Sequence, residues 1–218
     1  MNILVISPHP DDAEYGIGGC LLKLRENNSI TILYNTKYDL VDNKYNRNDE
    51  ARKSCLHLNA KYDFFNYEDD IQIISEKILY YKPDVIFLPF YDDLNSVHLE
   101  TTKKMLLVIE NLNIKENNNQ YSIKQIIYYE TYSSLNFKPS IIFDVSSYYA
   151  QSVKLLNFHK EGQETLRTLK YKFELMHKLY GLEIGTMYGE GIFISNHGFN
   201  KWKKNRVFLI NIVKQLYE

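Results

Sequence analysis

The chain has 218 residues, with 26 Lys and Arg against 27 Asp and Glu and a formal net charge of -1. This length suits a single domain, residues 1–218, with a sizeable core. The balanced charge excludes a protein whose main task is to grip nucleic acid or an acidic membrane, because those partners require a concentrated basic surface. Cys20 and Cys55 are too few for a disulfide framework, so we expect a reducing, cytoplasmic setting.

No targeting or membrane-spanning segment is visible in the sequence. Met1 to Ser7 is apolar, but two prolines and two aspartates follow within five residues. The apolar run Val85 to Tyr91 is far shorter than the roughly 20 residues that cross a bilayer. We therefore expect no integral membrane segment.

Short, nearly continuous apolar runs alternate with segments of helical spacing. The predicted strands are Asn2–Ile6, Ile30–Tyr34, Val85–Leu88, Ile123–Tyr129 and Ser140–Val145. The predicted helices are Ile17–Arg25, Asp49–Leu58, Ile71–Tyr81, Leu99–Leu112, Tyr148–His159, Leu166–Leu179 and Lys201–Leu216. Leu182 to Phe199 is expected to be irregular. This order predicts an α/β fold: a Rossmann-like, doubly wound, mostly parallel sheet with helices on both faces.

The segment after the first predicted strand carries the sharpest motif, Ser-Pro-His-Pro-Asp-Asp-Ala-Glu from Ser7 to Glu14. Charged groups at the tip of a buried strand cost free energy unless they are paired or bind a metal. His9 and Asp12 can converge on one divalent ion, which leaves Asp11 nearby as a candidate base. The alternative is a polar turn in which the aspartates cap the next helix.

A hydrolytic zinc centre keeps three protein ligands and one open position, so a third ligand is needed. Ligands in open α/β sheets bind outside the carboxyl ends of the strands. His98, in the segment Asp93–His98 beyond the third apolar run, is placed there. The alternative is a histidine that faces solvent at the start of a helix.

These residues resemble the motifs of the PIG-L/LmbE family of metal-dependent N-deacetylases. The His-Pro-Asp-Asp-x-Glu motif and its glycines are matched from His9 to Gly19. Weaker matches follow in the family's order: Arg47 and Glu50 to Ala60; Asp93 to His98; Phe143 to Ser146; Lys154, His159 and Gln163; and Tyr188 to Phe193.

The resemblance implies a zinc-dependent hydrolase that removes the acetyl group from an N-acetylated amino sugar, such as N-acetylglucosamine, or from a sugar conjugate. It implies that His9, Asp12 and His98 bind Zn²⁺ and that Asp11 is the general base; Fe²⁺ or Co²⁺ also suits such ligands. Zinc lowers the pKa of a bound water to about 7 and polarises the amide carbonyl. The catalytic residues so implied are Asp11, His159 and Tyr188, and the substrate-contacting residues are Arg47, Asn95, His159 and Tyr188.

The second motif departs from the family at two positions. Asn95 stands where the family has a histidine that assists the leaving amine or stabilises charge, and Val97 replaces the aspartate beside it. Another donor, such as His159 or Tyr188, then takes that role, or the leaving group needs less help. The third reading is a non-catalytic, metal-containing sugar-binding module.

Other features of the sequence carry weaker indications. Gly16, Gly18 and Gly19 could suggest a nucleotide-binding loop, but they lack the G-x-G-x-x-G spacing and the loop is acidic. His57, His177 and His197 are interpreted as scaffold residues. Sugar specificity is expected in loops such as Tyr38–Asn48 and in the irregular segment Leu182–Phe199, and a homo-oligomer is left open.

Overall fold

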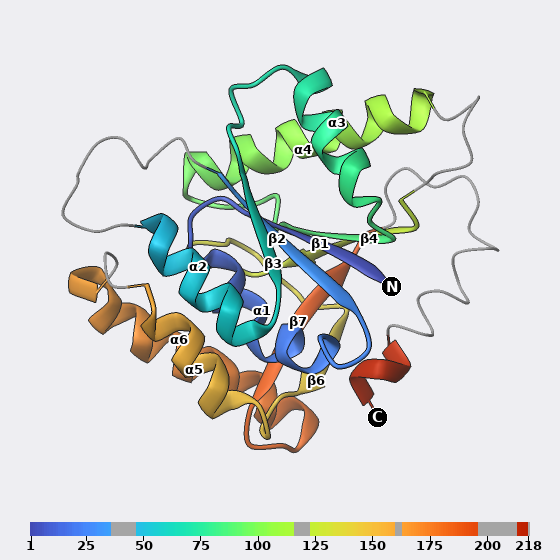
Figure 1. Cartoon of the computed structure of the whole chain (residues 1–218). Coiled ribbons are helices and arrows are strands. Elements are labelled where there is room, and N and C mark those ends of the chain that lie inside the picture. Colours follow the sequence, from blue (N-terminus) through green and yellow to red (C-terminus); the bar gives the residue numbers. More distant parts are fainter. Residues whose placement is uncertain (36–46, 116–122, 160–162, 196–212, 218) are drawn as a thin grey trace.

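The computed structural model describes residues 1–35, 47–115, 123–159, 163–195 and 213–217 (Figure 1). Its strands are β1 (Asn2–Ser7), β2 (Ser29–Asn35), β3 (Lys61–Phe65), β4 (Val85–Pro89), β5 (Gln125–Tyr129), β6 (Ile141–Asp144) and β7 (Gly189–Ile194). Its helices are α1 (Asp12–Leu24), α2 (Arg47–Leu58), α3 (Ile71–Tyr81), α4 (Ser96–Lys115), α5 (Tyr149–Asn157) and α6 (Gln163–Ile184). Within this part of the chain, no helix combines the length and the apolar character needed to cross a bilayer.

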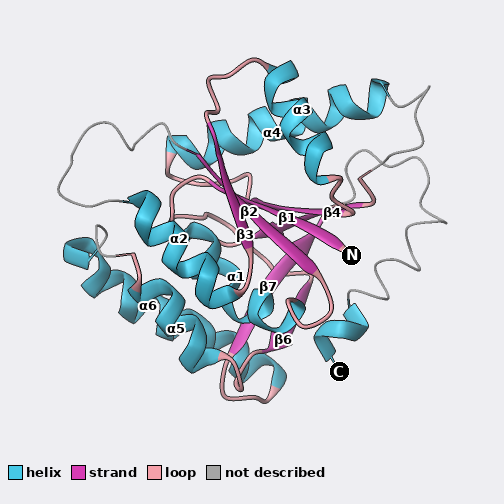
Figure 2. Cartoon of the chain, viewed as in Figure 1, coloured by secondary structure: helices cyan, strands magenta, loops and turns pink. Residues whose placement is uncertain are grey.

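The described strands form one sheet in the order β3-β2-β1-β4-β5-β7-β6. The strand pairs from β3 to β5 are parallel, whereas β7 runs antiparallel to both β5 and β6. Helices α1, α2 and α5 cover one face, and α3 and α4 cover the other (Figures 1 and 2). The predicted doubly wound, mostly parallel α/β fold is confirmed.

The central strands are apolar because both of their faces are covered. β4 is buried at every position, and β1 is buried at all positions except Asn2. The neighbouring strands β1 and β4 are followed by helices on opposite faces of the sheet, α1 on one and α4 on the other. The crevice beyond the carboxyl ends of these two strands is therefore the topological switch point of the sheet. The segments that follow β1 and β4 therefore meet there.

Two strands and several helix ends differ from the sequence-based predictions. β3 was not predicted, because it is an edge strand whose first residues are exposed and polar. β7 lies inside Leu182–Phe199, which was expected to be irregular, and its glycines and glutamate hide the strand pattern. α1 begins at Asp12, five residues before the predicted start. The predicted helix Lys201–Leu216 lies outside the described residues up to position 212.

A buried carboxylate from β7 holds a bend in α1. Ile17, with φ of -144° and ψ of 24°, interrupts the helix. The N–H groups of Gly19 and Cys20 donate to the two carboxylate oxygens of Glu190, each at 2.7 Å. The same carboxylate lies 2.9 Å from Nε2 of His177. Glu190 thus caps the second half of α1, and His177 is a scaffold residue, as predicted.

The glycines that follow the first motif are explained by packing. A Cβ atom on Gly16 would lie 2.2 Å from the Glu130 carbonyl oxygen, and one on Gly19 would lie 2.9 Å from Cβ of Val145. Neither position leaves room for a side chain, because Gly16 lies against the Glu130 backbone and Gly19 against the Val145 side chain. This close packing accounts for the glycines without a bound nucleotide.

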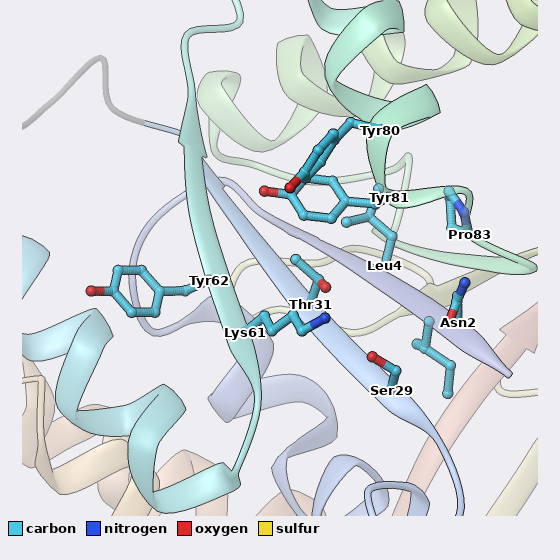
Figure 3. A pocket seen from close by; sticks show the side chains of 10 residues that line it. Asn2, Leu4, Ser29, Thr31, Lys61, Tyr62, Tyr80, Tyr81 and Pro83 are labelled. Carbon is cyan, nitrogen blue, oxygen red and sulfur yellow. The ribbon is translucent and has the colours of Figure 1, made fainter.

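A pocket of about 460 Å³ opens at the amino-terminal ends of the strands, on the opposite side of the sheet from the crevice (Figure 3). Asn2, Ser29 and Lys61, the first residues of β1, β2 and β3, line it together with the ring of Tyr81. Because these strands are parallel, the pocket lies at their amino ends. It is therefore distinct from the crevice at their carboxyl ends.

Candidate metal centre

The turn between β1 and α1 is closed by its own hydrogen bonds. The Ser7 hydroxyl donates to the His9 carbonyl oxygen at 2.6 Å and accepts from the Ala13 N–H at 3.2 Å. The His9 N–H donates to Oδ2 of Asp12 at 2.8 Å. Pro8 and Pro10 restrict the backbone on either side of His9. This turn therefore holds His9 and Asp12 on the same side of the loop.

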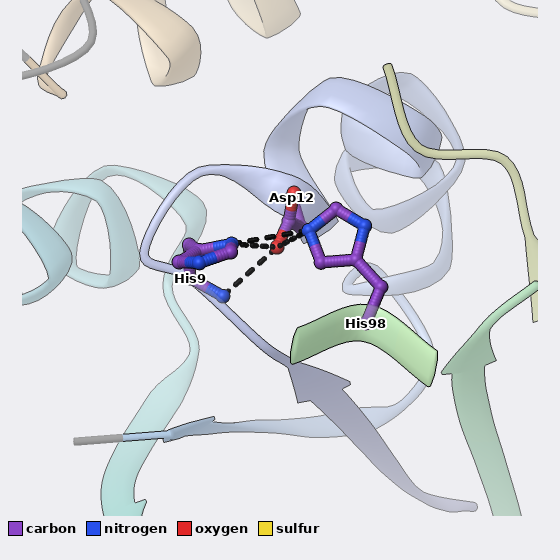
Figure 4. A group of neighbouring side chains, drawn as sticks. All are labelled: His9, Asp12 and His98. Atoms are coloured by element: carbon purple, nitrogen blue, oxygen red, sulfur yellow. Dashed lines mark hydrogen bonds and ion pairs between the residues drawn. The ribbon is translucent and has the colours of Figure 1, made fainter. Parts of the chain in front are cut away.

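His98, near the start of α4, completes a group of three side chains (Figure 4). Oδ2 of Asp12 lies 3.1 Å from Nδ1 of His9 and 3.2 Å from Nε2 of His98. The two ring nitrogens lie 3.1 Å from each other. A tetrahedral zinc ion with bonds of about 2.0–2.1 Å places its ligand atoms about 3.3 Å apart. The spacing of these three atoms thus suits one divalent ion.

Burial and an unpaired oxygen support the same interpretation. The side chains of Asp12 and His98 are 1% and 0% exposed, whereas His9 is 15% exposed, so the group opens on the His9 side. Oδ1 of Asp12 is buried without a hydrogen-bond partner among the described residues. An orphaned carboxylate oxygen is costly unless a cation lies beside it. These residues fit a metal with one open coordination position.

Asp93 orients His98 through the ring nitrogen that does not face His9 and Asp12. Nδ1 of His98 lies 3.1 Å from Oδ2 of Asp93, and Asp93 also accepts hydrogen bonds from the hydroxyls of Thr131 at 2.5 Å and Ser133 at 2.6 Å. A proton on Nδ1 that faces this carboxylate leaves the Nε2 lone pair free for a metal. Asp93 and Thr131 were not among the predicted site residues, although Asp93 opens the second motif.

The charges at the centre favour a cation. Burial opposes ionisation of Asp12, but His98 and His9 hold the pKa of its carboxyl well below the ordinary range. Burial likewise disfavours a charged His98, but Asp12 and Asp93 outweigh it and raise the pKa of this ring to about 10. The negative field that holds a proton on His98 in the metal-free chain also favours a divalent ion.

Asp11 lies beside this group without belonging to it. It is the N-cap residue of α1, yet its side chain makes no capping hydrogen bond. Its Oδ2 lies 3.9 Å from Nη2 of Arg47. Burial and then the neighbouring Asp12 raise the pKa of Asp11, while Arg47, His159 and His9 oppose the shift. The alternative of a simple helix-capping turn is therefore wrong for Asp11, whose carboxylate is left available.

His159 is buried under the turn and is 1% exposed. Its Nε2 lies 3.2 Å from Oε1 of Glu14, which also accepts hydrogen bonds from Tyr34 and Ser54. Burial disfavours the charged ring, but Glu14, with Asp11 and Glu50, raises the pKa of His159 overall. The predicted contact of His159 with substrate stays a prediction.

The other predicted site residues, Tyr188, Asn95 and Arg47, contribute no atom to the group of three candidate ligands. Tyr188 directly precedes β7 and lies beside the carboxyl end of β6. Its ring stacks on that of Tyr149, with the ring centroids 3.6 Å apart. Asn95, in the loop before α4, bonds to Tyr132. Roles for Tyr188 and Asn95 toward substrate stay predictions, as does the role of Arg47.

Two further predictions fall on residues that the structure does not describe. Residues 38–46 of the predicted specificity loop Tyr38–Asn48 lie outside the described residues, and so does His197.

Residues 4–110 match the family model of PIG-L, described as GlcNAc-PI de-N-acetylase. This range contains the turn after β1 and the start of α4, and hence all three candidate ligands. The resemblance inferred from the sequence motifs is thereby confirmed.

Solved structures share the fold over nearly the whole chain. The conserved protein TT1542 from Thermus thermophilus is similar with a TM-score of 0.75 and 19% identity, covering 93% of this chain and 98% of that one. The N,N'-diacetylchitobiose deacetylase from Pyrococcus horikoshii gives 0.72 and 21%, covering 88% and 83%. The 4-carboxy-2-hydroxymuconate hydratase GalB from Pseudomonas putida KT2440 gives 0.74 and 14%, covering 92% and 99%. Since one of these is a hydratase, the shared fold does not by itself select the reaction.

Proposed function

Since residues 4–110 belong to the PIG-L family, we propose that this protein is a metal-dependent N-deacetylase that hydrolyses the acetamide of an N-acetylated amino sugar or sugar conjugate. The observation that carries the proposal is the convergence of His9, Asp12 and His98, whose ligand atoms all lie within 4.8 Å of one another. Similarity to a sugar deacetylase from Pyrococcus horikoshii supports the substrate class.

Each residue of the centre has a separate task in this reaction. A divalent ion held by His9, Asp12 and His98 would lower the pKa of water and polarise the amide carbonyl. Asp11 takes a proton from the attacking water as the water oxygen bonds to the carbonyl carbon. The proton then passes to the amine nitrogen as the C–N bond breaks, which gives acetate and a free amine. Arg47, 3.9 Å from Asp11, favours the ionised form of that carboxylate and opposes the rise in its pKa.

The native ion, the sugar and the cellular location remain parts of the proposal. Two histidines and one aspartate suit Zn²⁺ best, and Fe²⁺ or Co²⁺ next. N-acetylglucosamine and its conjugates are the first substrates to test. A cytoplasmic location agrees with the two free, buried cysteines, Cys20 and Cys55.

The experiment is an amine-release assay over a panel of N-acetylated sugars and sugar nucleotides, with Zn²⁺, Fe²⁺ or Co²⁺ added to chelator-treated protein. We expect turnover with metal and none without it. Asp11→Asn should lower kcat by about 10²- to 10⁴-fold while the bound metal stays at the wild-type level, because Asp11 supplies no ligand atom.

Asp70→Asn is the matched control, because Asp70 is exposed and its side chain caps no N–H group. It should retain full activity. Wild-type deacetylation by Asp11→Asn, or turnover in the metal-free protein, would contradict the mechanism.

A metal-containing sugar-binding module is the second candidate, favoured by Asn95 and Val97 in place of the family's histidine and aspartate. It predicts that the metal-loaded protein binds a sugar of the panel in calorimetry without releasing amine. Any turnover that a chelator abolishes excludes it.

A further inference from the structure

The orientation of the Asn95 amide is fixed by its hydrogen bonds. Its Oδ1 accepts from the Val97 N–H at 2.9 Å. Its Nδ2 therefore faces the Tyr132 hydroxyl oxygen, 3.1 Å away. An amide nitrogen only donates, so the phenol oxygen accepts this bond and its proton must point elsewhere. No hydrogen bond between described residues uses that proton.

Tyr132 lies beside the proposed metal centre. Its ring meets the His98 ring edge to face, with centroids 5.7 Å apart and planes at 84°. On its other side it contacts Tyr15, with centroids 6.4 Å apart. A tyrosine phenol has an ordinary pKa of about 10. It therefore carries its proton near neutral pH and can donate a hydrogen bond.

The backbone that carries Tyr132 is tied to the residue that orients His98. Its two neighbours, Thr131 and Ser133, both donate their hydroxyl protons to Asp93. The Ser133 carbonyl oxygen accepts from the Leu94 N–H at 3.0 Å. Asp93 thus fixes the metal ligand and the tyrosine together, as preorganised catalysis requires.

We infer that the Tyr132 hydroxyl donates a hydrogen bond to the substrate carbonyl oxygen at the metal centre, and that Asn95 is its positioning residue. The inference rests on the proposed deacetylase function. In the tetrahedral intermediate that oxygen becomes negative, so a fixed donor stabilises it more strongly than it stabilises the starting amide. The proton stays on the phenol throughout. Tyr132 thereby supplies a charge-stabilising donor in addition to the roles predicted for His159 and Tyr188.

Tyr132→Phe tests the inference, because it removes the hydroxyl and keeps the ring contacts with His98 and Tyr15. With the sugar that the panel identifies, kcat should fall by about 10²-fold or more, as when one oxyanion donor is lost, while KM changes little. Zn²⁺ affinity, measured by titration of the apoprotein, and Tm should stay at the wild-type values. Tyr149→Phe, which retains the stack on Tyr188, is the control and should keep full activity.

Asn95→Ala separates positioning from mere packing. On its own it should reduce kcat by about 10-fold, because the phenol loses its orienting bond but not its proton. Combined with Tyr132→Phe, it should reduce kcat no further than Tyr132→Phe alone. Additive losses would show that Asn95 acts independently of Tyr132.

The outcomes distinguish this inference from the function on which it rests. A wild-type protein that releases no amine from any sugar with any of the three metals refutes the deacetylase proposal, and the donor role with it. An active wild type with Tyr132→Phe within about threefold of it refutes the donor role alone. A Tyr132→Phe variant with weaker Zn²⁺ affinity or a lower Tm than the wild type assigns the tyrosine a structural role instead.

Discussion

At the scale of single residues, Asp93 is the residue that orients His98 at the candidate metal centre. Its carboxylate is 0% exposed and receives two hydroxyl donors besides the His98 ring. Burial opposes its ionisation, but His98, Ser133 and Thr131 lower the pKa of Asp93 overall. The carboxylate is therefore charged where His98 needs it, and it fixes which ring nitrogen carries the proton.

Asp93→Asn should weaken Zn²⁺ binding by about 10- to 100-fold without removing a ligand atom. The amide lacks the negative charge, and one end of it presents N–H groups to the hydroxyls of Thr131 and Ser133. Competition with a zinc-binding dye measures the change. Asp92→Asn is the matched control, because the Asp92 carboxylate accepts a hydrogen bond from the exposed Asn136 side chain at 3.0 Å and from no other described residue. Equal losses in both variants would contradict the role of Asp93.

At the scale of elements, the helices, the central strands and β6 could be predicted, but β3 and β7 could not. The spacing of apolar residues predicts α3 over Ile71–Tyr81, and the structure has the same bounds, because Ile74 and Ile78 face the sheet. β7 was missed because its register depends on close packing rather than on side-chain pattern. A Cβ on Gly191 would lie 2.7 Å from Pro139, so glycine replaces the usual strand residue there.

Glu190→Gln tests the capping of α1 by β7. The amide offers one acceptor oxygen where the carboxylate offered two, so either Gly19 or Cys20 loses its partner and the link to His177 is weakened. We expect a loss of about 3 kcal/mol in the free energy of unfolding, measured by urea titration. Glu183→Gln, at an exposed position of α6, should leave it unchanged; a similar stability for both variants would be evidence against the cap.

At the scale of the whole molecule, the C-terminal half completes a site whose candidate metal ligands all come from the N-terminal half. The convergence of these three residues could be predicted because His9 and Asp12 share one short motif and His98 follows a neighbouring strand. Thr131 and Tyr132 could not, because they reach the centre only through the pairing of β4 with β5. No local pattern around residue 131 indicates that contact.

Packing within the C-terminal half should appear in the pH dependence of stability through Glu130. Its carboxylate accepts from the Tyr180 hydroxyl at 2.6 Å, and burial raises its pKa although Tyr180, Lys172 and His177 oppose the shift. The folded state therefore binds this proton more tightly than the unfolded state. The resulting stabilisation is complete below the unfolded pKa of about 4.3 and is lost as pH rises through the folded pKa.

Glu130→Gln removes this titration and keeps an oxygen that can accept from Tyr180. The free energy of unfolding of the variant minus that of the wild type should rise as pH increases from about 4. It should be constant at lower pH. Urea titrations of the two proteins across this range give the difference directly, and a flat or falling difference would refute the assignment.

The bonds from Thr131 and Ser133 to Asp93 limit how this protein can be shortened or recombined with relatives. A fragment that ends at residue 110 would include His9, Asp12 and His98 but not the hydroxyls that hold the carboxylate behind His98. It would also leave the α1 bend without Glu190. The smallest piece that can present this metal centre intact therefore extends through β5 to β7, and a chimaera joined after α4 must supply matching hydroxyls and an equivalent carboxylate from its new partner.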